Sequence, residues 1–148
     1  MDFDISCVES LERPIVFTNG CFDLFHYGHL YSLQQSKKFG KSLVVGINSE
    51  KSIKMFKDGD RPIIGDFHRI EIVKALRCVD YAFIFNELTV DKYIKEIIPD
   101  YYVKGIEWKD NLPELTDNIE VKFIDRIENL STTEIINKID YEKNFNKI

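Results

Sequence analysis

Two of the three histidines in this chain lie three residues apart, at positions 26 and 29, in the segment NGCFDLFHYGH over residues 19–29. Around the start of a helix, side chains at this spacing point toward the same side, so His26 and His29 can face one bound group. An imidazolium can donate a hydrogen bond to a phosphate and stabilise charge that develops there in a transition state. The pair therefore predicts chemistry at a phosphate group, although a lone histidine on a helix is more commonly packed or solvated.

Two glycines belong to the same segment. Gly20 would let the chain turn tightly where a strand ends, and Gly28 would let backbone approach a phosphate at a helix start, where anions are favoured. A metal site is a second interpretation of the segment, with Asp23 as a carboxylate ligand beside the histidines. The segment offers few further ligands at close spacing, which weakens that interpretation.

Strands and helices must alternate to position this segment. Short apolar runs bounded by turn residues predict five buried strands, at residues 14–19, 42–48, 81–85, 101–104 and 120–124. Apolar residues at helical spacing predict helices at residues 28–39, 66–77 (capped by Asp66), 89–98 and 131–139, with a short helix and an exposed loop over 50–65. Residues 1–13 show no clear period and predict a loose N-terminal arm ahead of one domain over residues 14–148.

The fold class follows from this alternation. Strands that read as continuous apolar runs between helices predict an α/β fold, a single Rossmann-like domain whose five-stranded parallel sheet has helices on both faces. Ligands of such sheets bind beyond the carboxyl ends of the strands, at the point where the strand order reverses. The histidine segment directly follows the first strand, so it lies where this fold class binds ligands.

Composition narrows the possible partners. The chain has 148 residues, 44% hydrophobic and 30% charged, with a formal net charge of -5. That charge argues against nucleic acid, which needs a basic face, and no apolar run approaches the roughly 18–20 residues of a membrane-spanning helix. Residues 1–14 lack the basic and apolar regions of a signal peptide, which predicts a cytoplasmic protein. Three widely spaced cysteines predict neither disulfides nor a zinc site.

The segment TNGCFDLFHYGH resembles the HxGH motif of the cytidylyltransferase-like nucleotidyltransferase superfamily. Within it, the chain is most similar to the adenylyltransferase domain of bacterial ADP-heptose synthase, through LVVGINS, Lys54, Lys57, Arg61-Pro62, ALRCVDY, IIPDYYVKG and STTEII. The resemblance implies a nucleotidyltransferase domain over residues 14–148. That domain would transfer a nucleotidyl group from an NTP to a phosphorylated sugar or polyol and release pyrophosphate, with Mg²⁺ bound through the NTP. It also implies a homodimer.

The resemblance assigns roles to individual residues. It implies that His26, His29 and Lys57 are catalytic and that Asp23 is a metal ligand, with Glu107 as a second available carboxylate. The residues that it implies for nucleotide binding are Gly20, Cys21, Phe22, Asp23, Gly28, Lys104, Gly105, Arg126, Ser131, Thr132 and Thr133. Those that it implies for substrate binding are Lys54, Arg69, Arg77, Glu107 and Trp108.

Several of these residues have a simpler interpretation. Lys54 and Lys57 could be solvated lysines, and Cys21 is expected to serve packing. Ser131 could be a plain N-cap with Glu134 three residues on. Arg77 could compensate a helix dipole or contact a second subunit.

Two stretches differ from the ADP-heptose synthases, which we call the heptose branch of the superfamily. Glu107-Trp108 and RIENLSTT over residues 126–133 are closer to glycerol-3-phosphate cytidylyltransferases. We expect ATP as donor and a sugar phosphate such as heptose 1-phosphate as acceptor, with CTP and glycerol 3-phosphate or a related polyol phosphate as the alternative. A non-catalytic nucleotide-binding module is a third possibility, and the presence of both histidines, Lys57 and the Ser-Thr-Thr run weighs against it.

Overall fold

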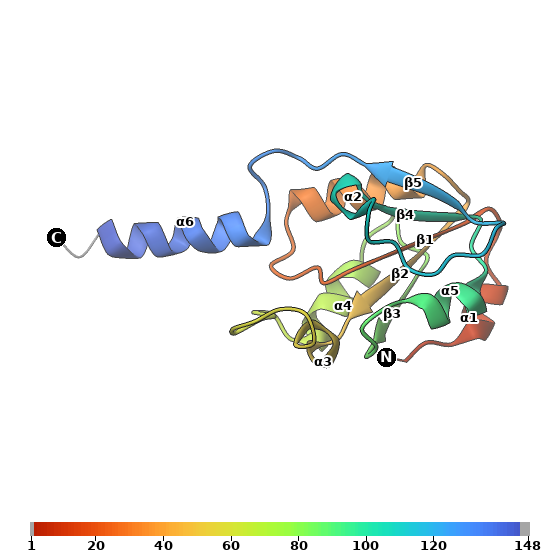
Figure 1. The fold of residues 1–148 in the computed structure, drawn as a ribbon, viewed down its shortest axis with the longest axis horizontal. Helices are drawn as coiled ribbons and strands as arrows, with labels where there is room; N and C mark the ends of the chain where they lie inside the picture. Colours follow the sequence, from red (N-terminus) through yellow and green to blue (C-terminus); the bar gives the residue numbers. More distant parts are fainter. Residues whose placement is uncertain (1, 146–148) are drawn as a thin grey trace.

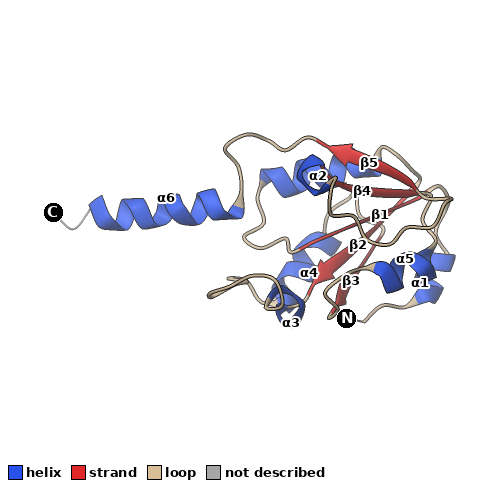
Figure 2. Ribbon diagram, in the orientation of Figure 1, coloured by secondary structure: helices blue, strands red, loops and turns tan. Residues whose placement is uncertain are grey.

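A computed structural model of the chain describes residues 2–145, which contain one five-stranded parallel sheet in the order β3-β2-β1-β4-β5. The predicted strand ranges agree with the observed ones to within one residue at each end, and the predicted fold class is confirmed (Figure 2). The strands are β1 (Ile15–Gly20), β2 (Ser42–Asn48), β3 (Tyr81–Phe85), β4 (Tyr101–Gly105) and β5 (Glu120–Ile124).

Helices cover both faces of this sheet, as the sequence predicts. On one face, α1 (Ile5–Glu9) and α5 (Asp91–Ile97) pack against an aromatic core that includes Phe17 and Phe83. On the other face, α2 (Tyr27–Lys37) and α4 (Asp66–Lys74) enclose a more aliphatic core. The remaining elements are α3 (Glu50–Ile53), a short 3₁₀ helix η1 (Ile106–Trp108) and α6 (Thr132–Phe145).

The prediction of a loose N-terminal arm is wrong. Asp4 caps α1 by accepting a hydrogen bond from the backbone N–H of Ser6 at 2.9 Å, and Val8 is almost fully buried. The ring of Phe3 packs edge-on against Phe83 with the ring centroids 4.8 Å apart. A helix of five residues is too short to show a period, which is why the pattern did not reveal it.

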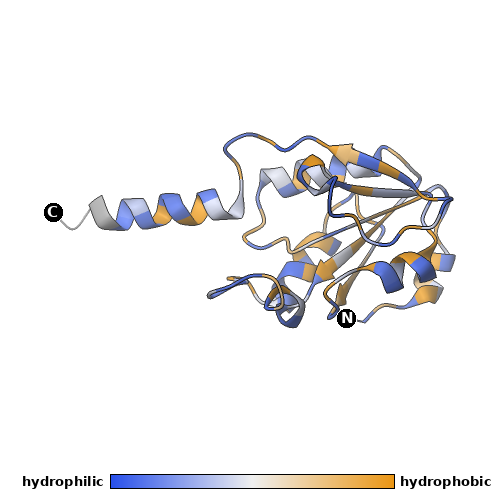
Figure 3. Ribbon diagram, in the orientation of Figure 1, coloured by the Kyte–Doolittle hydropathy of each residue, from blue (hydrophilic) through white to orange (hydrophobic). Residues whose placement is uncertain are grey.

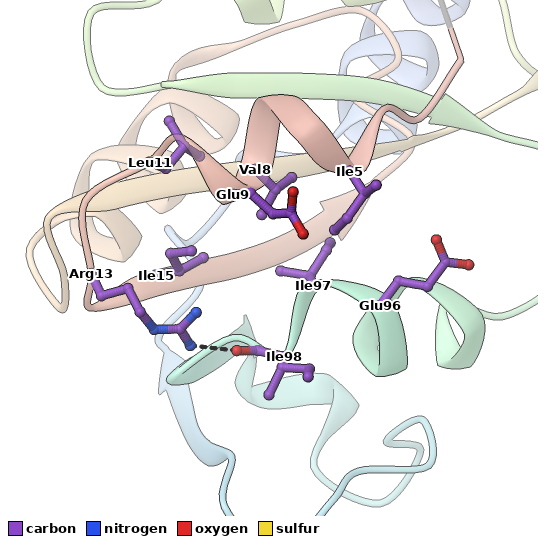
Figure 4. Close-up of a pocket in the computed structure, with 9 residues that line it drawn as sticks. All are labelled: Ile5, Val8, Glu9, Leu11, Arg13, Ile15, Glu96, Ile97 and Ile98. Atoms are coloured by element: carbon purple, nitrogen blue, oxygen red, sulfur yellow. Dashed lines mark hydrogen bonds between the residues drawn. The ribbon is translucent and has the colours of Figure 1, made fainter.

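A cavity of about 330 Å³ lies between α1 and α5 (Figure 4). At its rim, Arg13 donates a hydrogen bond to the backbone oxygen of Ile98 at 2.5 Å and forms an ion pair with Asp100 at 3.2 Å. Ile15, the first residue of β1, also lines it. The cavity therefore lies at the amino end of β1, whereas the histidine segment follows the carboxyl end.

Two helix starts differ from the prediction. α2 begins at Tyr27, one residue before the predicted start, with His26 as its N-cap, and Gly65 rather than Asp66 is the N-cap of α4. Asp66 lies inside the first turn, where its carboxylate accepts a hydrogen bond from the backbone N–H of Glu50 at 2.7 Å. The carboxylate thus joins the starts of α3 and α4 instead of capping its own helix.

The final helix projects from the body of the protein on the side of the carboxyl ends of the strands (Figure 1). Ser131 caps it as predicted, since its Oγ accepts a hydrogen bond from the backbone N–H of Glu134 at 3.1 Å. Ile135 lies beside α4, where it lines an apolar groove with Ile64 and Ile72. Hydrophilic and hydrophobic residues alternate along α6 (Figure 3), and residues 137–143 are exposed. Among residues 2–145, no helix combines the length and apolarity needed to cross a membrane.

Candidate active site

The segment with the two histidines lies at the carboxyl ends of β1 and β4. These strands are neighbours in the sheet, and the chain leaves β1 toward β2 on one side while β4 and β5 lie on the other. The ammonium group of Lys104, at the end of β4, donates a hydrogen bond to the backbone oxygen of Asn19 at 2.9 Å. The switch in strand order thus falls beside this segment, which is where parallel sheets bind ligands.

His26 and His29 form one rigid unit at the start of α2. The Nδ1 atom of His26 accepts a hydrogen bond from the backbone N–H of Gly28 at 3.1 Å, and Nδ1 of His29 accepts one from the backbone N–H of His26 at 3.3 Å. The rings are stacked with their centroids 3.8 Å apart. Because each Nδ1 is an acceptor, we assign the proton of each neutral ring to Nε2. Each ring can therefore donate an Nε2–H hydrogen bond to a ligand.

The pKa values of both histidines are lowered in the ligand-free protein. Burial, helped by the neighbouring His26, lowers the pKa of His29 to about 3. Burial also lowers the pKa of His26, and the positive charge of Arg126 lowers it further. Both shifts favour the neutral form of the rings.

The two glycines make room for side chains of the motif. A Cβ on Gly28 would lie 2.8 Å from Cε1 of His26, so this position must be glycine for the ring to fold back over the helix start. A Cβ on Gly20 would lie 3.2 Å from the ring of Phe22. The tight turn expected at Gly20 instead falls on Phe22 and Leu24, whose φ angles are 51° and 46°.

Asp23 has a structural role, and its expected role as a metal ligand stays a prediction. Its side chain is buried, and its two carboxylate oxygens accept hydrogen bonds from the backbone N–H groups of Ile63 and Ile64, both at 2.9 Å. Its backbone oxygen accepts a hydrogen bond from Oγ1 of Thr132 at 2.7 Å. Asp23 thereby ties the loop after α3 and the start of α6 to the motif. Within residues 2–145, no three His, Cys, Asp or Glu side chains are grouped as metal ligands.

Lys57 lies where its charge reaches His29. Its side chain is exposed on the loop after α3, and its positive charge contributes to the lowered pKa of His29. The same charge acts on the thiol of Cys21, whose pKa is raised overall because the thiol is buried. Lys54, at the C-cap of α3, is exposed as well. The catalytic role of Lys57 and the substrate role of Lys54 stay predictions.

Lys104 lies within a small polar and aromatic cluster. Burial lowers its pKa to about 8, and its ammonium group lies 4.7 Å from the centre of the Trp108 ring. Trp108 is 42% exposed, and Glu107 beside it is exposed too. A Cβ on Gly105 would collide with the carboxylate of Glu107. The structure places Lys104, Gly105, Glu107 and Trp108 together at the carboxyl end of β4, as expected. Their contacts with a ligand stay predictions.

Two arginines do not lie where a substrate could reach them. Arg69 is 1% exposed, and its guanidinium donates hydrogen bonds to three backbone oxygens, those of Cys21, Asn48 and Ile64, and pairs with Asp66. It therefore braces the motif loop from beneath and has no face for a substrate phosphate. Substrate binding by Arg69 is excluded by this burial.

Arg77 is exposed but lies at the wrong end of the sheet. It follows α4, just before Asp80, whose backbone N–H donates to the backbone oxygen of Leu43 near the start of β2. The amino ends of the strands lie there, so Arg77 cannot contact a substrate at the carboxyl ends of the same chain. Its alternative role in a subunit contact stays a prediction.

The start of α6 approaches the histidines. The positive charge of Arg126 contributes to the lowered pKa of His26, although Arg126 itself is exposed. A Cβ on Gly28 would lie 3.5 Å from the backbone oxygen of Leu130. The loop that leads into α6 therefore lies against α2, with Asn129 in a left-handed conformation at a φ of 56°. The nucleotide-binding roles of Arg126 and of Ser131, Thr132 and Thr133 stay predictions.

Sequence reasoning missed two polar residues at this site. Arg61 lies between Asp23 and Thr133, with its guanidinium 3.4 Å from Oδ2 of Asp23 and 3.3 Å from Oγ1 of Thr133. Asn19 accepts hydrogen bonds from both Lys104 and the hydroxyl of Tyr102, the latter at 2.7 Å. The only sequence signal for Arg61 was its place beside Pro62 in a stretch shared with the heptose branch.

Comparisons with known proteins cover most of the chain. The chain is 43% identical over 133 residues to the bifunctional protein HldE of Campylobacter fetus subsp. fetus and 44% identical over 128 residues to that of a Nitratiruptor species. The alignments cover 89% and 86% of this chain but 29% and 28% of these relatives, so the chain spans less than a third of their length. The solved lipopolysaccharide core biosynthesis protein from Thermoplasma volcanium GSS1 is 26% identical, with a TM-score of 0.65, over 77% of this chain and 98% of that one.

The cytidylyltransferase-like family profile matches residues 17–138. This range contains the stacked histidines, nearly all of the described sheet and the start of α6. The superfamily predicted from the HxGH motif is therefore confirmed, and the chain belongs to the cytidylyltransferase-like family.

Proposed function

We propose that the chain is a nucleotidyltransferase that moves an adenylyl group from ATP to a sugar phosphate such as heptose 1-phosphate. The observation that supports this best is the stacked pair of His26 and His29, which presents two Nε2–H donors at the start of α2. Donors that are fixed in advance beside a helix N-terminus stabilise negative charge that builds up on a phosphate. Lys57 and Arg126 add positive charge near the pair.

The reaction needs no covalent enzyme intermediate. An oxygen of the acceptor phosphate forms a bond to the α-phosphorus of the NTP while the bond from that phosphorus to the oxygen bridging to the β-phosphate breaks. Pyrophosphate leaves with the electron pair of the broken bond. The Nε2–H groups of His26 and His29 would donate to the non-bridging oxygens of the α-phosphate, and the cations would neutralise the leaving pyrophosphate.

The choice of ATP as donor and a heptose phosphate as acceptor is based on the similar proteins. The bifunctional HldE proteins, which share about two residues in five with this chain, correspond to the ADP-heptose synthases that the sequence resembles. This similarity favours ATP and a heptose phosphate. The chain matches under a third of the length of those proteins, so the proposal extends only to the transfer reaction of the matched part.

One observation favours CTP and a polyol phosphate as the alternative. Glu107 and Trp108 follow the end of β4, and Trp108 is 42% exposed with its ring beside the ammonium group of Lys104. This aromatic and acidic pair resembles the glycerol-3-phosphate cytidylyltransferases. A different base or acceptor at this position would leave the reaction class unchanged.

Mg²⁺ would enter as part of the NTP substrate. Each carboxylate oxygen of Asp23 already accepts a hydrogen bond from a backbone N–H group. Mg²⁺ is commonly held by substrate phosphates and water, and it would neutralise phosphate charge. The homodimer and the cytoplasmic location stay predictions.

A pyrophosphate-release screen tests the proposal. The four NTPs are each combined with a panel of sugar and polyol phosphates in the presence of Mg²⁺. We expect acceptor-dependent release of pyrophosphate that is fastest with ATP and a sugar phosphate. Release with CTP and glycerol 3-phosphate alone would favour the alternative, and tight NTP binding without release would indicate a non-catalytic nucleotide-binding protein.

A further inference from the structure

Arg61 lies between the motif loop and the start of α6. Its Nη1 atom is 3.4 Å from Oδ2 of Asp23, and its Nη2 atom is 3.3 Å from Oγ1 of Thr133. Charge-assisted hydrogen bonds of a guanidinium are usually about 2.7–2.9 Å long. Both contacts of Arg61 are longer, so its guanidinium is held only weakly in this position.

Asp23 does not depend on Arg61 for its hydrogen bonds. The two carboxylate oxygens of Asp23 already accept from the backbone N–H groups of Ile63 and Ile64, each at 2.9 Å. These bonds also fix the backbone just after Arg61. The chain therefore holds the base of the Arg61 side chain firmly while the guanidinium has no strong protein partner among the described residues.

Arg69 shows what an arginine with a structural role looks like in this protein. Its side chain is 1% exposed, and its guanidinium donates to three backbone oxygens at 2.6–2.9 Å. The side chain of Arg61 is 18% exposed and has two long contacts. Since a guanidinium carries five N–H donors, most of those of Arg61 are available to a ligand.

The surroundings of Arg61 favour an anion. Thr133 lies in the first turn of α6, a helix of 14 residues whose N-terminus carries partial positive charge. Lys57 lies earlier on the same loop, and its charge reaches His29. The flat fork of a guanidinium matches two oxygens of one phosphate.

We propose that Arg61 binds a phosphate group of one of the two substrates, either the terminal phosphates of the NTP or the phosphate of the acceptor. The proposal rests on the proposed function, because it assigns Arg61 to the phosphates of that reaction. The guanidinium exchanges its two long contacts for a bidentate pair with phosphate oxygens. Asp23 keeps its backbone partners throughout.

Titrations of Arg61→Ala and Arg61→Lys with two probes test this inference. Inorganic pyrophosphate stands for the terminal phosphates of the NTP, and heptose 1-phosphate stands for the acceptor. We expect Arg61→Ala to weaken binding of one probe by about 10- to 100-fold, as loss of a charged hydrogen bond implies. Arg61→Lys, which keeps the charge but not the fork, should recover part of the loss.

Arg13→Ala is the matched control, since Arg13 is partnered by Ile98 and Asp100 at the other end of the sheet. In Arg61→Ala, KM should rise only for the substrate whose probe binds less tightly: the NTP if pyrophosphate binding is weakened, or the acceptor if heptose 1-phosphate binding is weakened. A purely structural role would not produce this selectivity. Wild-type affinity of Arg61→Ala for both probes would overturn the inference, as would an equal loss for both accompanied by a lower melting temperature. A wild-type protein that releases no pyrophosphate would instead contradict the proposed function.

Discussion

The imidazole rings of His26 and His29 lie stacked, with their centroids 3.8 Å apart and their planes 23° from parallel. Two charged rings at this distance would repel each other, and burial already disfavours the charge on His29. Each Nδ1 is also occupied by a backbone N–H of the same helix start. The arrangement therefore favours two neutral rings that keep their Nε2–H groups for a ligand, which suits the proposed binding of a triphosphate.

Replacing His26 or His29 by alanine should lower kcat by about 100- to 1000-fold, because each variant loses one donor to the reacting phosphate. His68→Ala is a matched control, since His68 is the third histidine and is exposed on α4. Steady-state rates of pyrophosphate release, with thermal unfolding as a check on the fold, measure the effect. Normal kcat in both variants would remove the histidines from the mechanism.

Gly28→Ala should slow the reaction although it adds only a methyl group. The new Cβ would lie 2.8 Å from Cε1 and 2.9 Å from Nδ1 of His26, so the ring must move. A displacement of about 1 Å in a catalytic group can cost about 100-fold in rate. The measurement is kcat of Gly28→Ala at saturating substrates. An unchanged kcat would mean that the position of the His26 ring does not limit the reaction.

Asp23→Asn should destabilise the protein without changing its need for Mg²⁺. The amide would retain one oxygen and turn an N–H group toward a backbone N–H of Ile63 or Ile64, leaving a buried donor unpaired at a cost of about 1–3 kcal/mol. Urea unfolding measures the loss, with Asp58→Asn on the exposed loop as control. If Asp23 were a metal ligand, the variant would need a higher Mg²⁺ concentration for half-maximal rate.

The pH dependence of kcat/KM should show the ionisation of Lys104. Burial lowers the pKa of its ammonium group to about 8, so the free protein carries this charge below pH 8 and loses it as the pH rises through that value. We expect kcat/KM to fall across the same range, because kcat/KM reports on the free enzyme. Lys104→Arg keeps its charge and should move the fall to higher pH. If the pH profile of Lys104→Arg were identical to that of the wild type, the fall in kcat/KM would belong to a group other than Lys104.

The sequence was sufficient for the five strands and for the end of the sheet at which the motif lies, but it did not reveal α1. Apolar runs marked all five described strands, and the HxGH motif marked the carboxyl end of β1. Roles that depend on burial could not be obtained in this way. Arg61 and Arg69 are the same residue type in neighbouring segments, yet Arg69 is saturated by backbone oxygens and Arg61 is not. Asp23 likewise has the chemistry of a metal ligand, and only its contacts with Ile63 and Ile64 reveal its structural role.

The fate of labelled oxygen tests the central claim most directly. The protein is incubated with ATP, Mg²⁺ and heptose 1-phosphate whose phosphate oxygens carry ¹⁸O, and the products are analysed by mass spectrometry. Direct attack of the acceptor phosphate on the α-phosphorus predicts a nucleotide-diphospho-sugar that retains all of the label, together with unlabelled pyrophosphate. Label in pyrophosphate, or hydrolysis of ATP without a sugar nucleotide, would contradict the proposed transfer.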